Sequence, residues 1–409
     1  MKKFNVPSNY RSPLISAIKN KRRENDKLKK DFNPSLLDFG GVQIFLSRHF
    51  GFCYGVENAI EISFKTVEEN PDKKIYLLSE MIHNPLVNND LKKRGVQFLM
   101  DTEGKTLLPF SKLSPGDIVI VPAFGTTLEM EEKLKQKGIE IEKYNTTCPF
   151  VEKVWNRAEA ISRNKYSIVV HGKPQHEETR ATFSHSAPHS PTVIVTDMAE
   201  TIELAKFIKG EKPSKDFYKI FKGKYSKDFN VEKGLERIGV VNQTTMLATD
   251  TQAIADYLRK VMMEHYHLDE NNIAERFADT RDTLCYATSE NQSAVYGLLE
   301  TKADLAIVVG GYNSSNTSHL VELCEGKFPT YFIKSADEII SSKQIRHYSL
   351  HKKKEITTIS FLPEKNPVRI AVTSGASCPD ALVEGVINRL ASFFKTSKTP
   401  EAVMKEFVS

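Results

Sequence analysis

A cysteine flanked by glycines, just after an apolar run, constrains this chain more than any other feature. Residues 42–46 read as a strand, and the sequence RHFGFCYGV follows at residues 48–56. Glycines allow the backbone to turn tightly and to approach another group closely. A thiolate placed where a strand gives way to a helix is stabilised by the positive end of that helix. We therefore interpret Cys53 as a ligand rather than as a packing residue.

Two further cysteines stand in comparable settings, Cys148 in NTTCP and Cys285 in DTLCYAT. The chain has five cysteines in 409 residues. This odd, widely spaced set is typical of thiols in a reducing compartment, not of a disulfide framework. A single cysteine is most often a buried filler, but three in such contexts favour ligation. The other two are expected to be core fillers: Cys324 and Cys378.

Three thiolates from distant segments suit either zinc or an iron–sulfur cluster, because both metals prefer soft ligands. The short C-x-x-C pairs that are typical of structural zinc sites are absent from the sequence. A cubane cluster normally takes four cysteines, so a set of three would leave one iron with an open position. Both metals remain open at this point.

Strand-like apolar runs alternate with helix-like segments from residue 41 onward. Such alternation predicts βαβ units and mostly parallel sheets, hence an α/β fold. The predicted strands open at residues 42, 74, 96, 117, 167, 192, 238, 305, 330 and 369.

The pattern predicts three α/β units with a segment at each end. The expected divisions are a basic, partly helical or disordered extension (1–38), a first unit with Cys53 whose leading strand can join the third unit (39–148), a second unit with an insertion near 207–236 (149–282), a third unit (283–395) and a tail (396–409). The net charge of +5 is small for this length, so no nucleic-acid partner is expected. No stretch approaches eighteen uninterrupted apolar residues, so no membrane partner is expected either. We expect a cytoplasmic protein, or one of the plastid stroma if residues 1–38 are a transit peptide.

Two loops after predicted strands suit an anion. GGYNSSN (310–316) and SGASCPD (374–380) offer backbone N–H groups and hydroxyls at helix N-termini, as phosphate sites do. Ser and Asn are also ordinary helix caps, so each loop alone is weakly specific. His83 and His176 could add charged donors.

A proton source is expected in HGKPQHEETRAT (171–182), where a buried carboxyl would have a raised pKa. The spacing leaves open whether Glu177 or Glu178 faces inward. A glutamate in the first turn of a helix can also simply stabilise the helix dipole.

Taken together, these motifs resemble the LytB/IspH family of 4-hydroxy-3-methylbut-2-enyl diphosphate reductases. The matching sequences are GFCYGV (51–56), IHNP (82–85), TTCP (146–149), HEE with Thr182 (176–178), QTT (243–245), CYAT (285–288), NSSN (313–316) and GAS (375–377). They cover residues 42 to about 390 in the family's order.

The resemblance implies a trefoil of three pseudo-symmetric α/β units, each with a mostly parallel sheet, around a central iron–sulfur cluster. The implied metal ligands are Cys53, Cys148 and Cys285, which hold one [4Fe–4S] cluster with an open iron. The implied diphosphate pocket comprises His83, His176, Ser314, Ser315, Asn316 and Ser377. Glu178 would donate the proton, and Thr244 would contact the substrate hydroxyl.

The implied reaction is the two-electron reductive dehydroxylation of (E)-4-hydroxy-3-methylbut-2-enyl diphosphate to isopentenyl and dimethylallyl diphosphate. It is the last step of the methylerythritol phosphate pathway of isoprene biosynthesis, with ferredoxin or flavodoxin as electron donor. One departure from the family pattern stands out, because many members have Ala-His-Gly where this chain has Phe124. Phenylalanine cannot donate a hydrogen bond, so Thr126, Thr127 or a lysine is expected to compensate unless binding is weaker.

Two other functions remain open from the residues alone. A zinc-dependent hydrolase of a phosphorylated small molecule would use the same cysteines and anion loops. A non-catalytic binding protein would use the basic segment 1–38 to contact RNA or a membrane.

Overall fold

The structure, a computed structural model, describes residues 4–278, 283–395 and 398–408. Among these residues the strands form three sheets, and the strand pairs within them are mostly parallel. The chain is an α/β protein, as predicted. No helix in the described part of the chain has the length and apolar character needed to cross a membrane.

The chain forms two compact units. Unit 1 comprises Met1–Glu57, His83–Leu86 and Tyr286–Ser409. Unit 2 comprises Asn58–Ile82 and Val87–Cys285. Parts of the predicted divisions, namely residues 1–3, 279–282, 396–397 and 409, lie outside the described residues.

The sheet of unit 1 runs in the order β1-β2-β15-β10-β11-β13-β12, with β14 paired to β13. Its strands are β1 (Ser35–Asp38), β2 (Val42–Leu46), β10 (Leu305–Val309), β11 (Thr330–Ile333), β12 (Ile339–Ser341), β13 (Gln344–Ser349), β14 (Lys354–Ile359) and β15 (Val368–Ser374). The four strands from β2 to β11 are parallel, whereas β1 and β12–β14 pair antiparallel. Every residue of β10 is buried, which is typical of a parallel strand covered on both faces.

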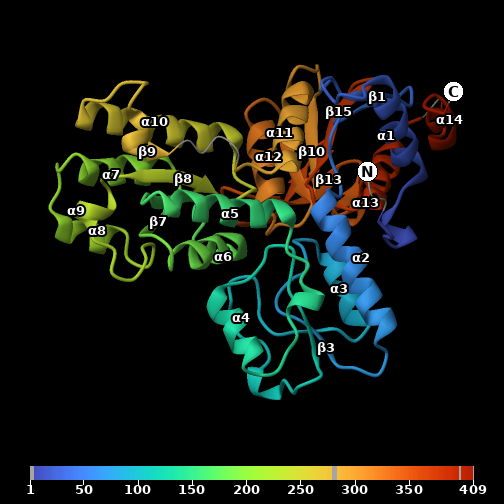
Figure 1. Cartoon of the computed structure of the whole chain (residues 1–409). Coiled ribbons are helices and arrows are strands. Elements are labelled where there is room, and N and C mark those ends of the chain that lie inside the picture. Colours follow the sequence, from blue (N-terminus) through green and yellow to red (C-terminus); the bar gives the residue numbers. More distant parts are fainter. Residues whose placement is uncertain (1–3, 279–282, 396–397, 409) are drawn as a thin grey trace. The chain divides into compact units, whose positions relative to one another are not determined.

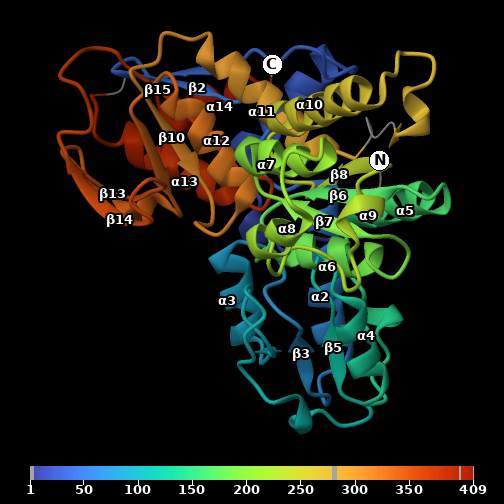
Figure 2. The same cartoon turned by 90° about the vertical axis from the view of Figure 1, so that its left-hand side faces the viewer.

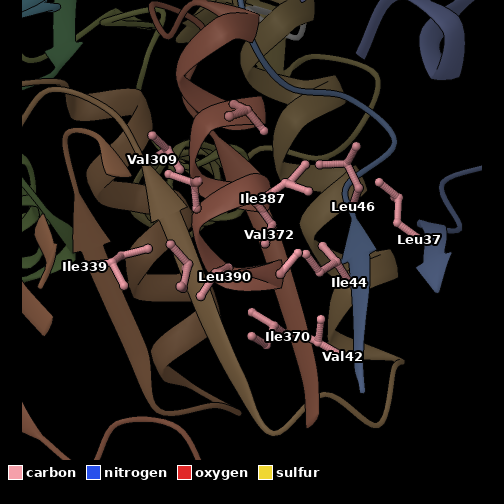
Figure 3. Close-up of a cluster of buried hydrophobic side chains, with 14 of the residues drawn as sticks. Leu37, Val42, Ile44, Leu46, Val309, Ile339, Ile370, Val372, Ile387 and Leu390 are labelled. Atoms are coloured by element: carbon pink, nitrogen blue, oxygen red, sulfur yellow. The ribbon is translucent and has the colours of Figure 1, made fainter. Parts of the chain in front are cut away.

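One face of this sheet packs on helix α13 (Asp380–Ala391). Figure 3 shows Ile387 and Leu390 of this helix among side chains of β2 and β15, including Ile44 and Val372. On the other face, α11 (Tyr286–Leu299) and α12 (Ser315–Glu325) contribute to a second apolar cluster. These helices therefore hold the carboxyl ends of β10 and β15 in place.

The terminal segments are part of the core of unit 1, and the N-terminal extension is partly helical, which was one of the two predicted alternatives. Helix α1 (Pro13–Asn25) buries Leu14, Ile15 and Ile18, and α14 (Pro400–Lys405) buries Val403 in the same cluster. Figure 1 shows α1 and α14 near each other, at the two ends of the colour scale. The apolar positions of α1 are easily overlooked in the sequence because lysines and arginines separate them from the next strand.

Unit 2 contains two all-parallel sheets, ordered β4-β3-β5 and β7-β6-β8-β9. The strands are β3 (Ile75–Leu77), β4 (Gln97–Phe98), β5 (Ile118–Ile120), β6 (Ser167–His171), β7 (Thr192–Val195), β8 (Ile238–Asn242) and β9 (Phe277–Ala278). The main helices beside them are α4 (Leu128–Lys135), α5 (Pro149–Arg163), α6 (Glu177–Ser186), α7 (Met198–Ile208) and α10 (Ala248–Tyr266). The starts of α5 and α6 carry most of the predicted site residues of this unit.

The stretch 207–236, predicted to be an insertion, packs into the core of unit 2. It contains α8 (Ser214–Ile220) and α9 (Val231–Gly234), which lie beside α7 in Figure 2. The Phe217 ring stacks on Phe221 and Phe229 with centroids 4.9 and 5.1 Å apart. Aromatic packing of this kind needs no helical period, which is why the sequence pattern did not reveal it.

Candidate functional site

The three predicted metal ligands share one local position, directly before a helix. Cys53 precedes α2 (Tyr54–Glu69), Cys148 is the N-cap of α5, and Cys285 precedes α11. None of the five cysteines forms a disulfide in the described part of the chain. The positive end of a helix favours a negatively charged group, so each of the three positions suits a thiolate. The predicted setting of Cys53 between a strand and a helix is confirmed.

Cys148 and Cys285 interact electrostatically within unit 2. Burial raises the pKa of the Cys148 thiol to about 12, and the nearby Cys285 and Glu178 add to this, while the backbone N–H groups of Phe150 and Val151 lower it. A desolvated thiol of this kind stays protonated unless a cation replaces its proton, and bound metals do exactly that for coordinating thiols. Burial raises the pKa of Cys324 and Cys378 in the same way, so this shift does not single out a ligand. What fits a thiophilic metal centre is that Cys148 and Cys285 are two sulfur donors that interact with each other.

Cys53 belongs to unit 1, where the backbone of a neighbouring loop holds it. Its N–H donates to the Ala376 carbonyl at 3.2 Å. Gly51 has φ +80°, and an added Cβ would lie 2.5 Å from Oδ1 of Asp380, so only glycine fits this turn. Within the described residues no set of three His, Cys, Asp or Glu side chains forms a metal site. Cys53 lies in unit 1, whereas Cys148 and Cys285 lie in unit 2. That the three cysteines bind one metal centre stays a prediction.

Five of the six predicted diphosphate residues lie in unit 1, and all five are buried: His83, Ser314, Ser315, Asn316 and Ser377. Ser314 caps α12 by accepting the Thr317 N–H at 3.3 Å. The Ser377 hydroxyl donates to the His83 carbonyl at 3.2 Å, and Asn313 Nδ2 lies 3.3 Å from His83 Nδ1. Three separate segments therefore meet at the N-terminus of α12.

The Asn316 amide is the most informative of these groups. Its Oδ1 accepts the Ala376 N–H at 2.9 Å, whereas its Nδ2 is buried and has no hydrogen-bond partner among the described residues. Leaving a buried donor unsatisfied is costly, so such a group indicates an acceptor that binds from outside the chain. An anionic oxygen at a helix N-terminus meets this need.

Unit 2 brings the other predicted residues together at the start of α6. The Glu178 carboxylate is 1% exposed, accepts the Thr244 N–H and interacts with Cys148. Glu177 is also buried, but it accepts the Ser79 hydroxyl instead. Both glutamates therefore lie inside, and Glu178 is the one beside a predicted metal ligand.

The side chain of Gln243 joins two parts of unit 2. In the sequence this residue stood out only as part of the QTT motif. Its Oε1 accepts the Thr179 hydroxyl at 2.9 Å and the Lys173 N–H at 3.1 Å, and its Nε2 donates to Thr245 at 2.6 Å. This fully buried amide ties the end of β8, which carries Thr244, to the start of α6. A glutamine between an apolar strand and two threonines was the signal for it.

His176 caps α6, with its Nδ1 accepting the Glu178 N–H at 3.2 Å. The Phe124 ring meets His176 edge to face, with centroids 5.6 Å apart. Of the two threonines expected to compensate for Phe124, Thr127 caps α4, and the Thr126 carbonyl lies 3.2 Å from His185 Nε2. Phe124 thus packs against a predicted diphosphate ligand instead of adding a donor.

Comparison with known proteins gives a consistent picture. Residues 44–391 match the family model described as LytB protein. The chain is 37% identical over 390 residues to 4-hydroxy-3-methylbut-2-enyl diphosphate reductase of Cyanothece sp., which covers 95% of this chain and 90% of that protein. It is 38% identical over 388 residues to the reductase of the same name from Trichodesmium erythraeum, covering 95% and 91%.

Two solved structures resemble the chain. One is (E)-4-hydroxy-3-methyl-but-2-enyl diphosphate reductase, described as the terminal enzyme of the non-mevalonate pathway, with a TM-score of 0.51, 25% identity, and coverage of 85% of this chain and 99% of that one. The other, the Plasmodium falciparum reductase, has a TM-score of 0.62 at 22% identity, covers 90% and 97%, and supports the fold alone. On the extent of the family match and the identity to its members, this chain belongs to the LytB family.

Proposed function

We propose that this protein is an iron–sulfur reductase that converts (E)-4-hydroxy-3-methylbut-2-enyl diphosphate to isopentenyl and dimethylallyl diphosphate. The observation that carries the proposal is the buried Glu178 carboxyl beside Cys148, held by the Thr244 amide. In this position Glu178 would be a proton donor next to a predicted metal ligand, in a chain whose relatives are named as this reductase.

Cys53, Cys148 and Cys285 would hold one [4Fe–4S] cluster and leave one iron without a protein ligand. When bound, the cluster would relay two electrons from the donor, one at a time, and would offer an open coordination position. Thiolate ligands and low-potential chemistry require a reducing compartment, and we propose the cytoplasm or a plastid stroma. We propose a ferredoxin or flavodoxin as the electron donor.

The diphosphate would be bound by His83, His176, Ser314, Ser315, Asn316 and Ser377. The Asn316 Nδ2 group donates to a phosphoryl oxygen and so loses its unsatisfied state. The N-terminus of α12 adds backbone N–H groups and a positive dipole end. These contacts fix the substrate by its anionic end.

Two protons accompany the two electrons in a reductive dehydroxylation. One leaves with the hydroxyl oxygen as water, and the other is added to the allylic carbon skeleton. Glu178 supplies a proton from its carboxyl group, and the Thr244 hydroxyl orients the substrate hydroxyl. Gln243 holds Thr244 in place relative to Glu178, because its side chain bonds to Thr179 and Lys173 at the start of α6.

The test is an anaerobic absorption spectrum with iron, sulfide and zinc analysis, followed by turnover with a reduced viologen. We expect iron and sulfide near the [4Fe–4S] stoichiometry, about four of each per chain, and formation of both C5 diphosphates. Zinc without sulfide, even after anaerobic reconstitution, would reject this function and favour the zinc-dependent hydrolase.

A further inference from the structure

The N-terminal segment, residues 4–33, contacts the turn that carries Cys53. Lys19 on α1 lies with its Nζ 2.7 Å from Oδ1 of Asp380 and 4.5 Å from the centroid of the Phe50 ring. The same Nζ would be 3.0 Å from a Cβ added at Gly51. One ammonium group therefore packs directly on the backbone of the turn, two residues before the cysteine.

Aromatic contacts extend this cover along the turn. Tyr10 meets Phe52 edge to face at 6.0 Å, and Phe4 meets Tyr54 edge to face at 4.9 Å. The two aromatic residues that flank Cys53 are thus each packed against a ring from the N-terminal segment. Bulky groups on both neighbours restrict the motion of the residue between them.

The ion pair between Lys19 and Asp380 also involves the loop whose backbone bonds to Cys53. Asp380 is the first residue of α13, at the end of the loop 374–380. In that loop Ala376 accepts the Cys53 N–H, and Ser377 donates to the His83 carbonyl. Lys19 therefore links the turn of a predicted metal ligand to the loop of a predicted diphosphate ligand, although 361 residues separate it from Asp380.

We propose that residues 4–33 act as a clamp on the Cys53 turn and that Lys19 is its positioning residue. The clamp holds the thiol in one orientation for the metal centre and limits the access of solvent and oxidants to it. This inference rests on the proposed function for the identity of the metal centre. Lys19 itself touches neither substrate nor ligand sulfur, so its effect passes through Gly51 and Asp380.

The experiment compares full-length wild type with Lys19→Met, which keeps the aliphatic stem but removes the charge. Arg23→Met is the matched control, because exposed Arg23 lies on the same helix and also carries one positive charge. Lys19→Arg is the conservative rescue. One readout is the alkylation rate of Cys53 in cluster-free protein, measured by peptide mass spectrometry with Cys148 as internal reference. The other is the rate at which the reconstituted cluster bleaches in air.

We expect the alkylation rate of Cys53 and the bleaching rate of the cluster to rise about fivefold in Lys19→Met. The rise is no larger because solvent partly screens the ion pair between Lys19 and Asp380. Arg23→Met should behave as wild type, and Lys19→Arg should restore most of the protection. If Cys53 is alkylated equally fast in Lys19→Met and wild type, the clamp is rejected.

A second series keeps the inference testable if Lys19→Met folds poorly. Asp380→Asn removes the other partner of the ion pair. In the double variant, the alkylation and bleaching rates should be no higher than in the more affected single variant. Additive effects would contradict a shared role. If wild type takes up no iron and sulfide, the proposed reductase fails, whereas the alkylation comparison still decides on the clamp.

Discussion

Two adjacent glutamates at the start of α6 illustrate how one residue's environment decides its role. Glu177 and Glu178 are both buried, but Glu177 accepts a hydroxyl from Ser79, whereas Glu178 accepts the Thr244 N–H and interacts with Cys148. A neutral carboxyl can donate a proton only where a reacting group is within reach. These partners suit Glu177 to a structural role and Glu178 to the proton donation that we propose.

Replacing Glu178 by Gln should lower turnover by about 10²–10⁴-fold, the usual contribution of a general acid, because the amide keeps the shape but cannot give up a proton. Iron content should remain that of wild type. Steady-state turnover with a reduced viologen and iron analysis of the same sample measure both. The control is Glu177→Gln, for which we expect a much smaller loss. Equal losses in the two variants would refute the assignment.

Changing Asn316 to Asp should weaken diphosphate binding, because a carboxylate replaces the unsatisfied donor and repels the anion. A hydrogen bond to a charged group is worth about 1.5–3 kcal/mol, so KM should rise at least about tenfold. Calorimetric titration with inorganic diphosphate provides a second measurement. Asn388→Asp, at an exposed amide on α13, is the control. Unchanged KM in Asn316→Asp would place the diphosphate elsewhere.

At the scale of elements, the aromatic segment of unit 2 makes a direct prediction. Phe217 is fully buried between Phe221 and Phe229, so Phe217→Ala should cost about 3–5 kcal/mol of local stability. Hydrogen exchange of peptides from α7 to α9 would report it as faster opening. Ile220→Ala, at an exposed position of α8, should change little. Similar exchange in both variants would mean that the segment is not packed as described.

The elements that sequence patterns predicted well are those in which hydrophobicity alone dictates structure. β2, β10 and β11 begin at the predicted residues because buried apolar side chains dominate them. Every residue of β10 is buried, whereas in β2 buried apolar residues alternate with half-buried ones. The antiparallel strands β12–β14 were not predicted. Residues of β14 alternate between exposed and half-buried, and lysines surround them, so backbone pairing rather than burial forms this strand.

In the candidate site, too, local features were predicted from the sequence, whereas long-range contacts were not. Cysteines, glycines and helix caps have local signals, and the sequence located them before α2, α5 and α12. The contacts of Lys19 with Asp380 and of Ala376 with Cys53 join segments more than 300 residues apart. Spacing carries no information about such pairs, because they depend on the register of β2 against β15.

At the scale of the whole molecule, stability should depend on pH below neutrality. Burial, with the positive charges of Arg48 and Lys29, lowers the pKa of His49 from 6.5 to about 4. Because the folded pKa is the lower one, the unfolded chain binds more protons between these two values. The contribution is fully present above pH 6.5 and is lost as pH falls towards 4, by roughly 2–3 kcal/mol. Burial also lowers the pKa of His185 and His347, which adds a loss of the same sign.

Urea unfolding at pH 7 and at pH 4.5 measures this loss. His49→Gln should reduce the difference in the free energy of unfolding between the two pH values, because the amide does not titrate in this range. His265→Gln, at an exposed position on α10, should leave the difference as in wild type. A wild-type slope in His49→Gln would show that other groups carry the pH dependence.

The path of the chain has a consequence for how the protein is made. β2 pairs with β15, so the central sheet of unit 1 joins segments more than 300 residues apart. The Cys53 N–H likewise bonds to the carbonyl of Ala376, which is synthesised much later. A ribosome delivers β2 well before its partner strand. The Cys53 turn therefore stays incomplete until residue 376 has been synthesised, and any cofactor held through this turn binds only after that point.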